Sequence, residues 1–358
     1  MNLTQLKVVI FAAILSPCLS SCIYAGEPMT VTTWNIEPLG SPGRGFGGGF
    51  GGFGRYSTPL RHDQLPLRSV EQLKSISDLI HKDLKSDIIA LQEVAVTHRR
   101  RHRSLNKQLD TITSQLQTSQ EGSKWSYFLP YLDVVPEDDD ERNIHLGFMW
   151  NNKRVRLVKV FEMSMADQVL AGKEIFQRTP LIGYFEEIRE DGSPGIDFVL
   201  VNVHFASGQQ NDENHLIAMT LIEFGIALDL AKNAVSEPSV FILGDFNENP
   251  KRQDTEGKWL TSPAMNEHMR FKGYTDLVTQ DMAFTRMNTK LSSLIDHILA
   301  NRSAFAHIIE PKATIYKPGG GMLGKTELFP AWSGTFSDHF PILFQIKSAK
   351  DNDSDFFE

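Results

Sequence analysis

Cysteine is almost absent from this chain. Only Cys18 and Cys22 occur among the 358 residues, and both lie within the first 25. The body that follows has no thiol for a disulfide, a zinc–thiolate site or redox chemistry. A chain of this length can bury enough apolar surface to fold without disulfides, so its core or a bound metal must stabilise it.

Long apolar runs and a basic excess are absent as well. Beyond residue 25 no apolar stretch is long enough to span a bilayer, which predicts a water-soluble body. The chain carries 36 Lys and Arg against 44 Asp and Glu, a formal net charge of −8, or −9 without the first 25 residues. Nonspecific adhesion to nucleic acid through bulk charge is therefore not expected. Any polyanionic substrate must be met by local basic residues and metal.

The first 25 residues have the layout of a secretory signal peptide. Lys7 is followed by an apolar run from Val8 to Leu15 and then by small residues. A lipoprotein leader is the alternative, because the sequence LSSC resembles a lipobox that would end the leader at Ser21 and lipidate Cys22. Both interpretations predict export to the periplasm or the extracellular space, the second with a lipid anchor on Cys22.

The rest of the chain alternates between strand and helix periodicity, which predicts an α/β fold of two packed sheets with helices outside them. A single catalytic domain over residues 26–350 and an acidic tail at 351–358 are the simplest division. Residues 41–59 form a Gly-rich insertion, interpreted as a flexible surface segment or, alternatively, as a lid over the site. We expect strands at 29–36, 87–94, 125–134, 145–151, 155–163, 175–187, 196–205, 240–246, 294–300 and 340–346, a tight turn at 191–195, and helices at 67–84, 105–116 and 211–234.

Six short polar motifs stand where apolar runs end: WNIE, LQEV, NVH, GDFN, IDH and SDH. Oxygen ligands without thiols suit a hard cation such as magnesium, which takes one or two carboxylates and keeps water for a phosphate. Zinc fits less well, because neither HExxH nor paired cysteines occur. The candidates around such a cation and phosphate are Asn35, Glu37, Glu93, Asp245, Asn247 and Asp338.

Histidines in these motifs supply candidate acids and bases. A general-base imidazole needs a carboxylate to hold its tautomer and stabilise its charged form, so Asp296 and His339 are a natural acid–base pair. His204, at the end of FVLVNVHF, is a second candidate, to contact or protonate a phosphate oxygen. Asn247 and Arg178 are candidate hydrogen-bond donors to the phosphate.

Taken in order, the motifs resemble the endonuclease/exonuclease/phosphatase superfamily, the DNase I-like fold, over residues 29–347. The resemblance implies a four-layered α/β/β/α sandwich, with two mixed sheets packed face to face and helices outside. It also implies hydrolysis of phosphate esters that depends on magnesium or manganese. The implied roles are Glu93 as main metal ligand with Asn35, Glu37 and Asp338 near the metal, Asp245 and Asn247 orienting water and phosphate, His339 with Asp296 as general base, and His204 as phosphate-binding or acid histidine.

Single positions extend the resemblance. DNase I-like nucleases, sphingomyelinases and inositol-phosphate phosphatases have histidine at the position of His204, whereas apurinic-site enzymes usually have asparagine. The segment QRTP resembles the DNase I segment whose arginine grips the scissile phosphate, which implies that role for Arg178. Glu141 is the candidate carboxylate partner of His204. The disulfide and calcium sites of secreted animal DNase I do not carry over, because the cysteines are missing.

Substrate class depends on loops. The basic run HRRRHR at 98–103 is interpreted as the start of a solvated helix or, alternatively, as a ridge that follows a phosphate backbone. The first hypothesis is an exported DNase I-like nuclease acting on DNA. The alternative is a sphingomyelinase-like or inositol-phosphate-type phosphoesterase acting on phospholipid or small phosphates, with residues 45–53 contacting the membrane. A binding module without catalysis is disfavoured, since every catalytic position is present, and no obligate protein partner is implied.

Overall fold

The computed structural model describes most of the chain between residues 26 and 349. The predicted leader, the Gly-rich insertion at 41–59, Glu141 and the acidic tail at 351–358 lie outside the described residues, so the predictions made for them stay predictions. The described residues are 26–39, 67–100, 103–119, 123–131, 144–164, 169–170, 173–207, 212–248, 273–279, 284–287, 292–318 and 329–349.

The first sheet has six strands and is built around the parallel pair β1 and β2, with antiparallel pairing elsewhere. Both central strands are buried along almost their whole length, as expected for strands covered on both faces. The order across the sheet is β17 (Thr314–Ile315), β18 (Ile342–Ile346), β1 (Met29–Leu39), β2 (Ile88–Ala95), β6 (Ile144–Asn151) and β5 (Trp125–Phe128).

The second sheet repeats this plan around the parallel pair β11 and β12. The predicted tight turn joins β10 to β11, where Gly192 adopts a φ of +78° that favours glycine. The order across this sheet is β13 (Thr275–Asp276), β16 (Asp296–Ala300), β12 (Val240–Asp245), β11 (Pro194–His204), β10 (Leu181–Ile188) and β7 (Val155–Glu162).

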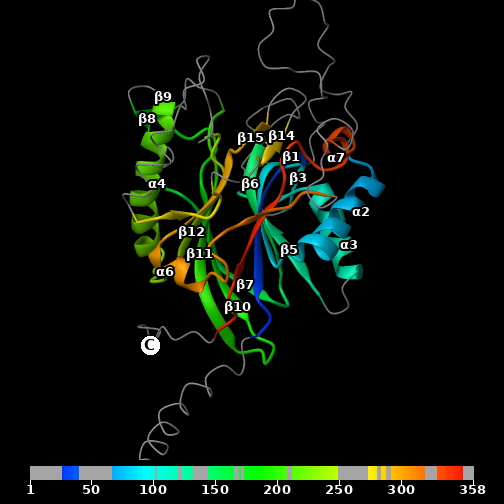
Figure 1. The fold of residues 1–358 in the computed structure, drawn as a ribbon, viewed down its shortest axis with the longest axis horizontal. Helices are drawn as coiled ribbons and strands as arrows, with labels where there is room; N and C mark the ends of the chain where they lie inside the picture. The colour runs from blue at the N-terminus through cyan, green and yellow to red at the C-terminus, as the bar shows by residue number, and fades with distance from the viewer. Residues whose placement is uncertain are drawn as a thin grey trace, which may run out of the picture.

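Three apolar cores join the elements into four layers (Figure 1). One core lies between the sheets and contains the edge-to-face rings of Phe148 and Phe185. The second lies between the first sheet and α2 and α3, and the third between the second sheet and α4. The predicted α/β/β/α sandwich is therefore confirmed. The helices are α2 (Val70–Asp78), its π-helical continuation η2 (Leu79–Leu84), α3 (Lys107–Ser119), α4 (Asp212–Lys232), α6 (Arg302–His307) and α7 (Phe329–Thr335).

Among the described residues, α4 is long and apolar enough to cross a membrane, over Asn214–Lys232. Its inner side, which includes Ala218, Met219 and Ile222, is buried in the core against the second sheet. The buried apolar side chains of α4 thus pack as an outer layer of the sandwich, while Phe224 and Leu228 are exposed.

Three local predictions are wrong. The strand expected over 125–134 ends at Phe128, shortly before Pro130, which has no N–H to donate to a sheet ladder. The strand expected over 175–187 begins only at Leu181, after Pro180, which has no N–H to donate to a sheet ladder. The basic run at 98–103 does not begin a helix, because β3 and β4 pair as a short antiparallel hairpin in which Arg99 lies opposite Ser104. The remaining short strands are β3 (His98–Arg100), β4 (Arg103–Leu105), β8 (Val169–Leu170), β9 (Lys173–Glu174), β14 (Arg286–Met287) and β15 (Ser292–Ser293).

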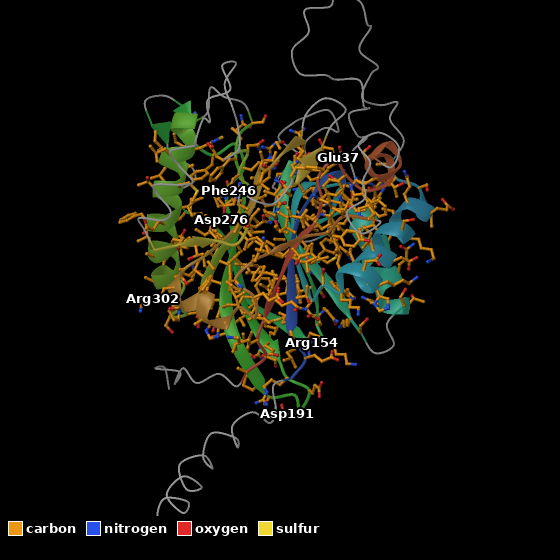
Figure 2. All side chains as sticks on the ribbon, viewed as in Figure 1. Glu37, Arg154, Asp191, Phe246, Asp276 and Arg302 are labelled. Carbon is orange, nitrogen blue, oxygen red and sulfur yellow. The ribbon has the colours of Figure 1, made fainter. Side chains whose placement is uncertain are left out.

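The two parallel pairs end at the same end of the sandwich. His204 and Asp245 are register partners at the ends of β11 and β12, and Asn35 near the end of β1 hydrogen-bonds Asp245 across the sheets. Figure 2 shows Glu37 at this end and Arg154 and Asp191 at the other. Because ligands of open α/β sheets bind beyond the carboxyl ends of parallel strands, this end is where a site is expected.

Candidate active site

Asn35 links the acidic residues of the two sheets. Its Nδ2 donates to Glu93 Oε1 at 3.0 Å and to Asp245 Oδ2 at 3.1 Å, while its Oδ1 accepts from the backbone N–H of Glu37 at 3.2 Å. The residue is 1% exposed, so these bonds form away from bulk water. Asn35 therefore fixes two carboxylates, one from each sheet, a few ångströms apart.

Three predicted site residues have left-handed backbone conformations that their side chains rarely adopt. The φ angles are +58° at Glu37, +60° at Glu93 and +51° at Asn247. Such conformations cost about 1–3 kcal/mol each and persist where the surrounding structure holds them. Two of the three are glutamates, so the fold tolerates backbone strain at the positions that set the direction of these carboxylates.

Gly244, directly before Asp245, is required by close packing. Its φ is +143°, and a Cβ there would overlap the backbone carbonyl of Val203 in the neighbouring strand. We expect Gly244→Ala to lower the free energy of unfolding by about 3 kcal/mol, the sum of backbone strain and overpacking. Thermal denaturation followed by circular dichroism measures the loss.

Gly192→Ala is the matched control for that prediction. Its φ is also positive, but no atom lies within 4 Å of the added Cβ, so we expect a loss of only about 1 kcal/mol. Equal losses in the two variants would contradict the steric explanation for Gly244.

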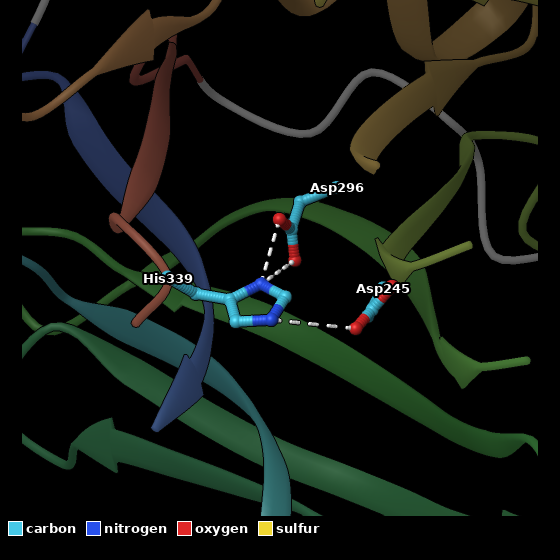
Figure 3. A group of neighbouring side chains, drawn as sticks. All are labelled: Asp245, Asp296 and His339. Carbon is cyan, nitrogen blue, oxygen red and sulfur yellow. Dashed lines mark hydrogen bonds and ion pairs between the residues drawn. The ribbon is translucent and has the colours of Figure 1, made fainter. Parts of the chain in front are cut away.

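His339 and Asp296 form a buried ion pair (Figure 3). The Nδ1 of His339 lies 3.0 Å and 2.9 Å from the two carboxylate oxygens of Asp296, and its Nε2 lies 3.8 Å from Asp245 Oδ2. Burial disfavours the charged ring, but Asp296, Asp338 and Asp245 outweigh it and raise the pKa of His339 to about 10. Its Nε2 also lies 3.6 Å from Asp338 Oδ1. The ring thus has one nitrogen held by a carboxylate and the other beside both Asp245 and Asp338.

Two hydroxyl groups hold this pair in place. Ser337 Oγ donates to the backbone carbonyl of Asn35 at 2.6 Å and accepts from the backbone N–H of His339 at 3.0 Å. Thr285 Oγ1 accepts from the backbone N–H groups of Ile295 and Asp296, each at 3.0 Å. Neither hydroxyl could be given a role from the sequence, although Ser337 stands inside the SDH motif.

His204 is buried beside the same carboxylates. Its Nε2 lies 3.6 Å from Asp245 Oδ2 and 3.8 Å from Glu93 Oε1, whereas its Nδ1 has no hydrogen-bond partner among the described residues. Burial, reinforced by the positive charges of Arg178 and His339, lowers the pKa of His204 well below 6.5. His204 is therefore neutral here, in contrast to His339. Its predicted partner Glu141 lies outside the described residues.

Arg178 and Asn247 lie at the margin of this group. The charge of Arg178 lowers the pKa of both His204 and His145. Asn247 donates from its backbone N–H to Asp245 Oδ1 at 2.8 Å and from Nδ2 to the carbonyl of Phe205 at 2.8 Å. Asn247 thus closes the turn that carries Asp245.

A second polar bridge lies behind the site. Gln92 Nε2 donates to Asn202 Oδ1 at 2.7 Å across the sheets, and Asn202 Nδ2 donates to the carbonyls of Leu91 and Gly147. Both side chains are fully buried. Although LQEV and NVH contain them, their role could not be predicted, because a buried amide is recognisable as a bridge only once its partner is known.

The acidic residues fit a divalent cation. Burial, with the negative charges of Asp338 and Glu93, raises the pKa of Glu37 to about 8 against the opposing charge of Arg68. Burial and the neighbouring Asp296 likewise raise the pKa of Asp245 to about 6. Such crowding of buried oxygen donors is relieved by a hard divalent ion.

The most compact group of potential ligands is Asp245, Asp296 and His339, whose ligand atoms lie within 4.8 Å of one another. The Nδ1 of His339 is already bonded to Asp296, so this compactness follows from a hydrogen-bonded pair. Glu93 and Glu37 are not part of that pair, and with Asp338 they remain the better donors for an ion.

Comparisons with known proteins agree with this geometry. The model of the Endonuclease/Exonuclease/phosphatase family matches residues 60–339. An endonuclease/exonuclease/phosphatase family protein from Bacteroides thetaiotaomicron is 14% identical, with a TM-score of 0.51 and coverage of 92% of this chain and 100% of its own. A second, from Bacteroides vulgatus, is 14% identical, with a TM-score of 0.51 and coverage of 90% and 99%. No curated protein matches the sequence. The resemblance predicted from the motifs is confirmed.

Proposed function

The chain belongs to the endonuclease/exonuclease/phosphatase family, and from that premise we propose that it is a divalent-metal-dependent phosphodiesterase that cleaves DNA. The family has a phosphoesterase fold. The observation that carries the proposal is the convergence of Asn35, Glu93, His204, Asp245 and His339 at the common end of both parallel strand pairs.

Glu93, with Glu37, Asp338 and Asn35 around it, would hold Mg²⁺ or Mn²⁺. Such an ion supplies Lewis acidity to a phosphoryl oxygen when bound. Asp296 contributes most to the raised pKa of His339, and the carboxylates of Asp338 and Asp245 add to it. A cation held beside Asp338 and Asp245 would offset their contribution, which favours the neutral imidazole that a general base requires.

His339 then accepts a proton from water at Nε2, while Asp296 at Nδ1 holds the tautomer and stabilises the resulting imidazolium. Asp245, 3.8 Å from the same Nε2, orients the water. His204 and Arg178 donate hydrogen bonds to the phosphate oxygens. These are the roles that the family resemblance implied, and they are proposed here for this chain.

The β3–β4 hairpin supports a nucleic acid substrate. It follows directly on β2, which carries Glu93, and Arg99, Arg100 and Arg103 are exposed on it. The hairpin, close in sequence to the proposed metal ligand Glu93, provides local positive charge on a chain with an acidic total.

Replacing Arg99, Arg100 and Arg103 together by alanine is therefore expected to weaken DNA binding and to flatten its salt dependence. The slope of log K against log salt concentration should fall by about one for each phosphate that the hairpin no longer neutralises. Fluorescence anisotropy with a labelled duplex at several salt concentrations measures the slope. Lys74→Ala, Lys82→Ala and Arg156→Ala combined remove the same charge elsewhere, and an equal effect in that control would contradict a DNA-binding hairpin.

Substrate class is tested by incubating the mature protein with plasmid DNA and with sphingomyelin vesicles, each with magnesium and with a chelator. We expect magnesium-dependent nicking of DNA. Release of lipid head groups with intact DNA would overturn the nuclease proposal in favour of a lipid phosphodiesterase.

We also propose that the protein is exported, which rests on the leader-like composition of residues 1–25 alone. Cell fractionation should find the protein outside the cytoplasm. Palmitate labelling that is lost in Cys22→Ser would identify a lipid anchor, whereas an unlabelled protein in the soluble fraction would identify a cleaved signal peptide.

A further inference from the structure

Arg286 is a cation at the site that no sequence motif indicated. Its Nε donates to Asp338 Oδ2 at 2.8 Å, and the negative charges of Asp245 and Glu93 also act on it. Arg286 therefore lies against Asp338, and its charge, like that of Arg178, also acts on His204.

The backbone that carries Arg286 is held rigidly. Arg286 forms a bridge with His339, and the neighbouring Thr285 accepts from the backbone N–H of Phe340 at 2.7 Å and donates to the carbonyl of Ser293 at 2.9 Å. Thr285 Oγ1 also accepts from the backbone of Asp296. The segment that positions the general-base pair thus positions the guanidinium as well.

The donors of Arg286 are only partly used. Among the described residues, its one hydrogen bond is from Nε, which leaves both terminal Nη groups without a protein acceptor. The side chain is 31% exposed, so it is partly buried against Asp338 and partly open to solvent. A guanidinium binds two oxygens of a phosphate with paired N–H groups, and a carboxylate on Nε fixes the direction of that fork.

We propose that Arg286 is a phosphate-binding residue whose Nη groups contact the oxygens of the substrate phosphate, with Asp338 as its orienting partner. The inference rests on the proposed phosphoesterase function and adds a second arginine to it. Arg286 and Arg178, whose charges both act on His204, would then bind the phosphate together.

The test measures binding of inorganic phosphate by titration calorimetry, with and without Mn²⁺, together with the affinity for Mn²⁺ alone. Arg286→Ala and Arg286→Gln are expected to weaken phosphate binding by about 10-fold or more and to leave Mn²⁺ affinity unchanged or stronger. Arg286→Lys keeps the charge beside Asp338 but not the fork, so an intermediate loss is expected, and this variant carries the test if the others fail to fold.

Arg156→Ala is the matched control, because Arg156, exposed on the edge strand β7, makes a similar ion pair with Glu186 on β10. Its phosphate affinity should equal that of the wild type. Phosphate affinity within twofold of wild type in Arg286→Ala would overturn the proposal. So would a parallel loss of Mn²⁺ affinity, since Arg286 would then act through the metal ligands.

The same measurements separate this inference from the proposed nuclease function. If the protein cleaves neither DNA nor lipid but its phosphate binding depends on Arg286, the nuclease proposal is overturned. The role of Arg286 as a phosphate-binding residue is then supported. DNA cleavage with unaltered phosphate binding in Arg286→Ala would do the reverse.

Discussion

His339→Ala is expected to reduce kcat for phosphodiester cleavage by about 10³-fold, the middle of the range for loss of a general base. The Nε2 of His339 is the ring nitrogen directed at Asp245, and no other described imidazole combines that position with a carboxylate on Nδ1. The KM should change little, because the ring is expected to act on water. Steady-state kinetics with a chromogenic phosphodiester separates the two constants.

A second readout of this variant is the pH dependence of stability in chelator. The folded pKa of His339, about 10, is above the ordinary value of 6.5, so its ion pair stabilises the fold fully below pH 6.5. That contribution disappears as the pH rises through 10. The difference in Tm between wild type and His339→Ala should therefore shrink from pH 7 to pH 10.

His307→Ala is the control, since His307 ends α6 on the second sheet and contacts none of the predicted catalytic residues. Its kinetics should equal those of the wild type. If His339→Ala retains a substantial fraction of kcat, another group is the base, and the assignment from the SDH motif is wrong.

Glu93→Gln is expected to abolish metal-dependent activity. Glutamine keeps the shape of the side chain, but it removes the charge of the proposed main ligand. We expect Mn²⁺ affinity to fall by more than about 100-fold, because even partners outside the coordination shell contribute about 10- to 100-fold. Calorimetry measures the affinity, and cleavage should fall to the level seen with chelator.

Glu186→Gln provides the comparison, as a carboxylate paired with Arg156 away from the site. Unchanged Mn²⁺ affinity in Glu93→Gln would move the metal to another group, of which Asp245, Asp296 and His339 form the most compact. Comparing the Mn²⁺ affinities of Glu93→Gln and Glu186→Gln decides whether the metal binds at Glu93 or at that group.

The fold and most of the candidate site could be predicted from sequence for one reason. Asn35, Glu93, His204 and Asp245 stand where apolar runs end, and carboxyl ends of parallel strands meet at one edge. The family resemblance, and not the spacing of the motifs alone, indicated which strands are parallel neighbours. The contacts between residues more than 200 positions apart, such as Asn35 with Asp245, needed the structure.

Arg286 shows why other parts could not be predicted. It stands in AFTRMN, without periodicity or motif, and it reaches the site only because Thr285 and Phe340 pair their backbones. The basic hairpin was missed for a related reason. His98 to Arg100 lacks the alternation of apolar and polar residues that marks a half-buried strand. Its pairing with residues 103–105 joins two short strands whose arginines are exposed.

The contacts of Asn35 with Asp245, and of Gln92 with Asn202, determine which assay would first detect a substitution in the core. Hydrolysis would need side chains from both halves of the chain aligned to within about 1 Å, the tolerance typical of reacting groups. A substitution in the shared interior, for instance at Phe198, could let one half slide on the other with every helix and strand preserved. The rate of turnover would then fall while a spectroscopic measure of secondary structure stayed unchanged.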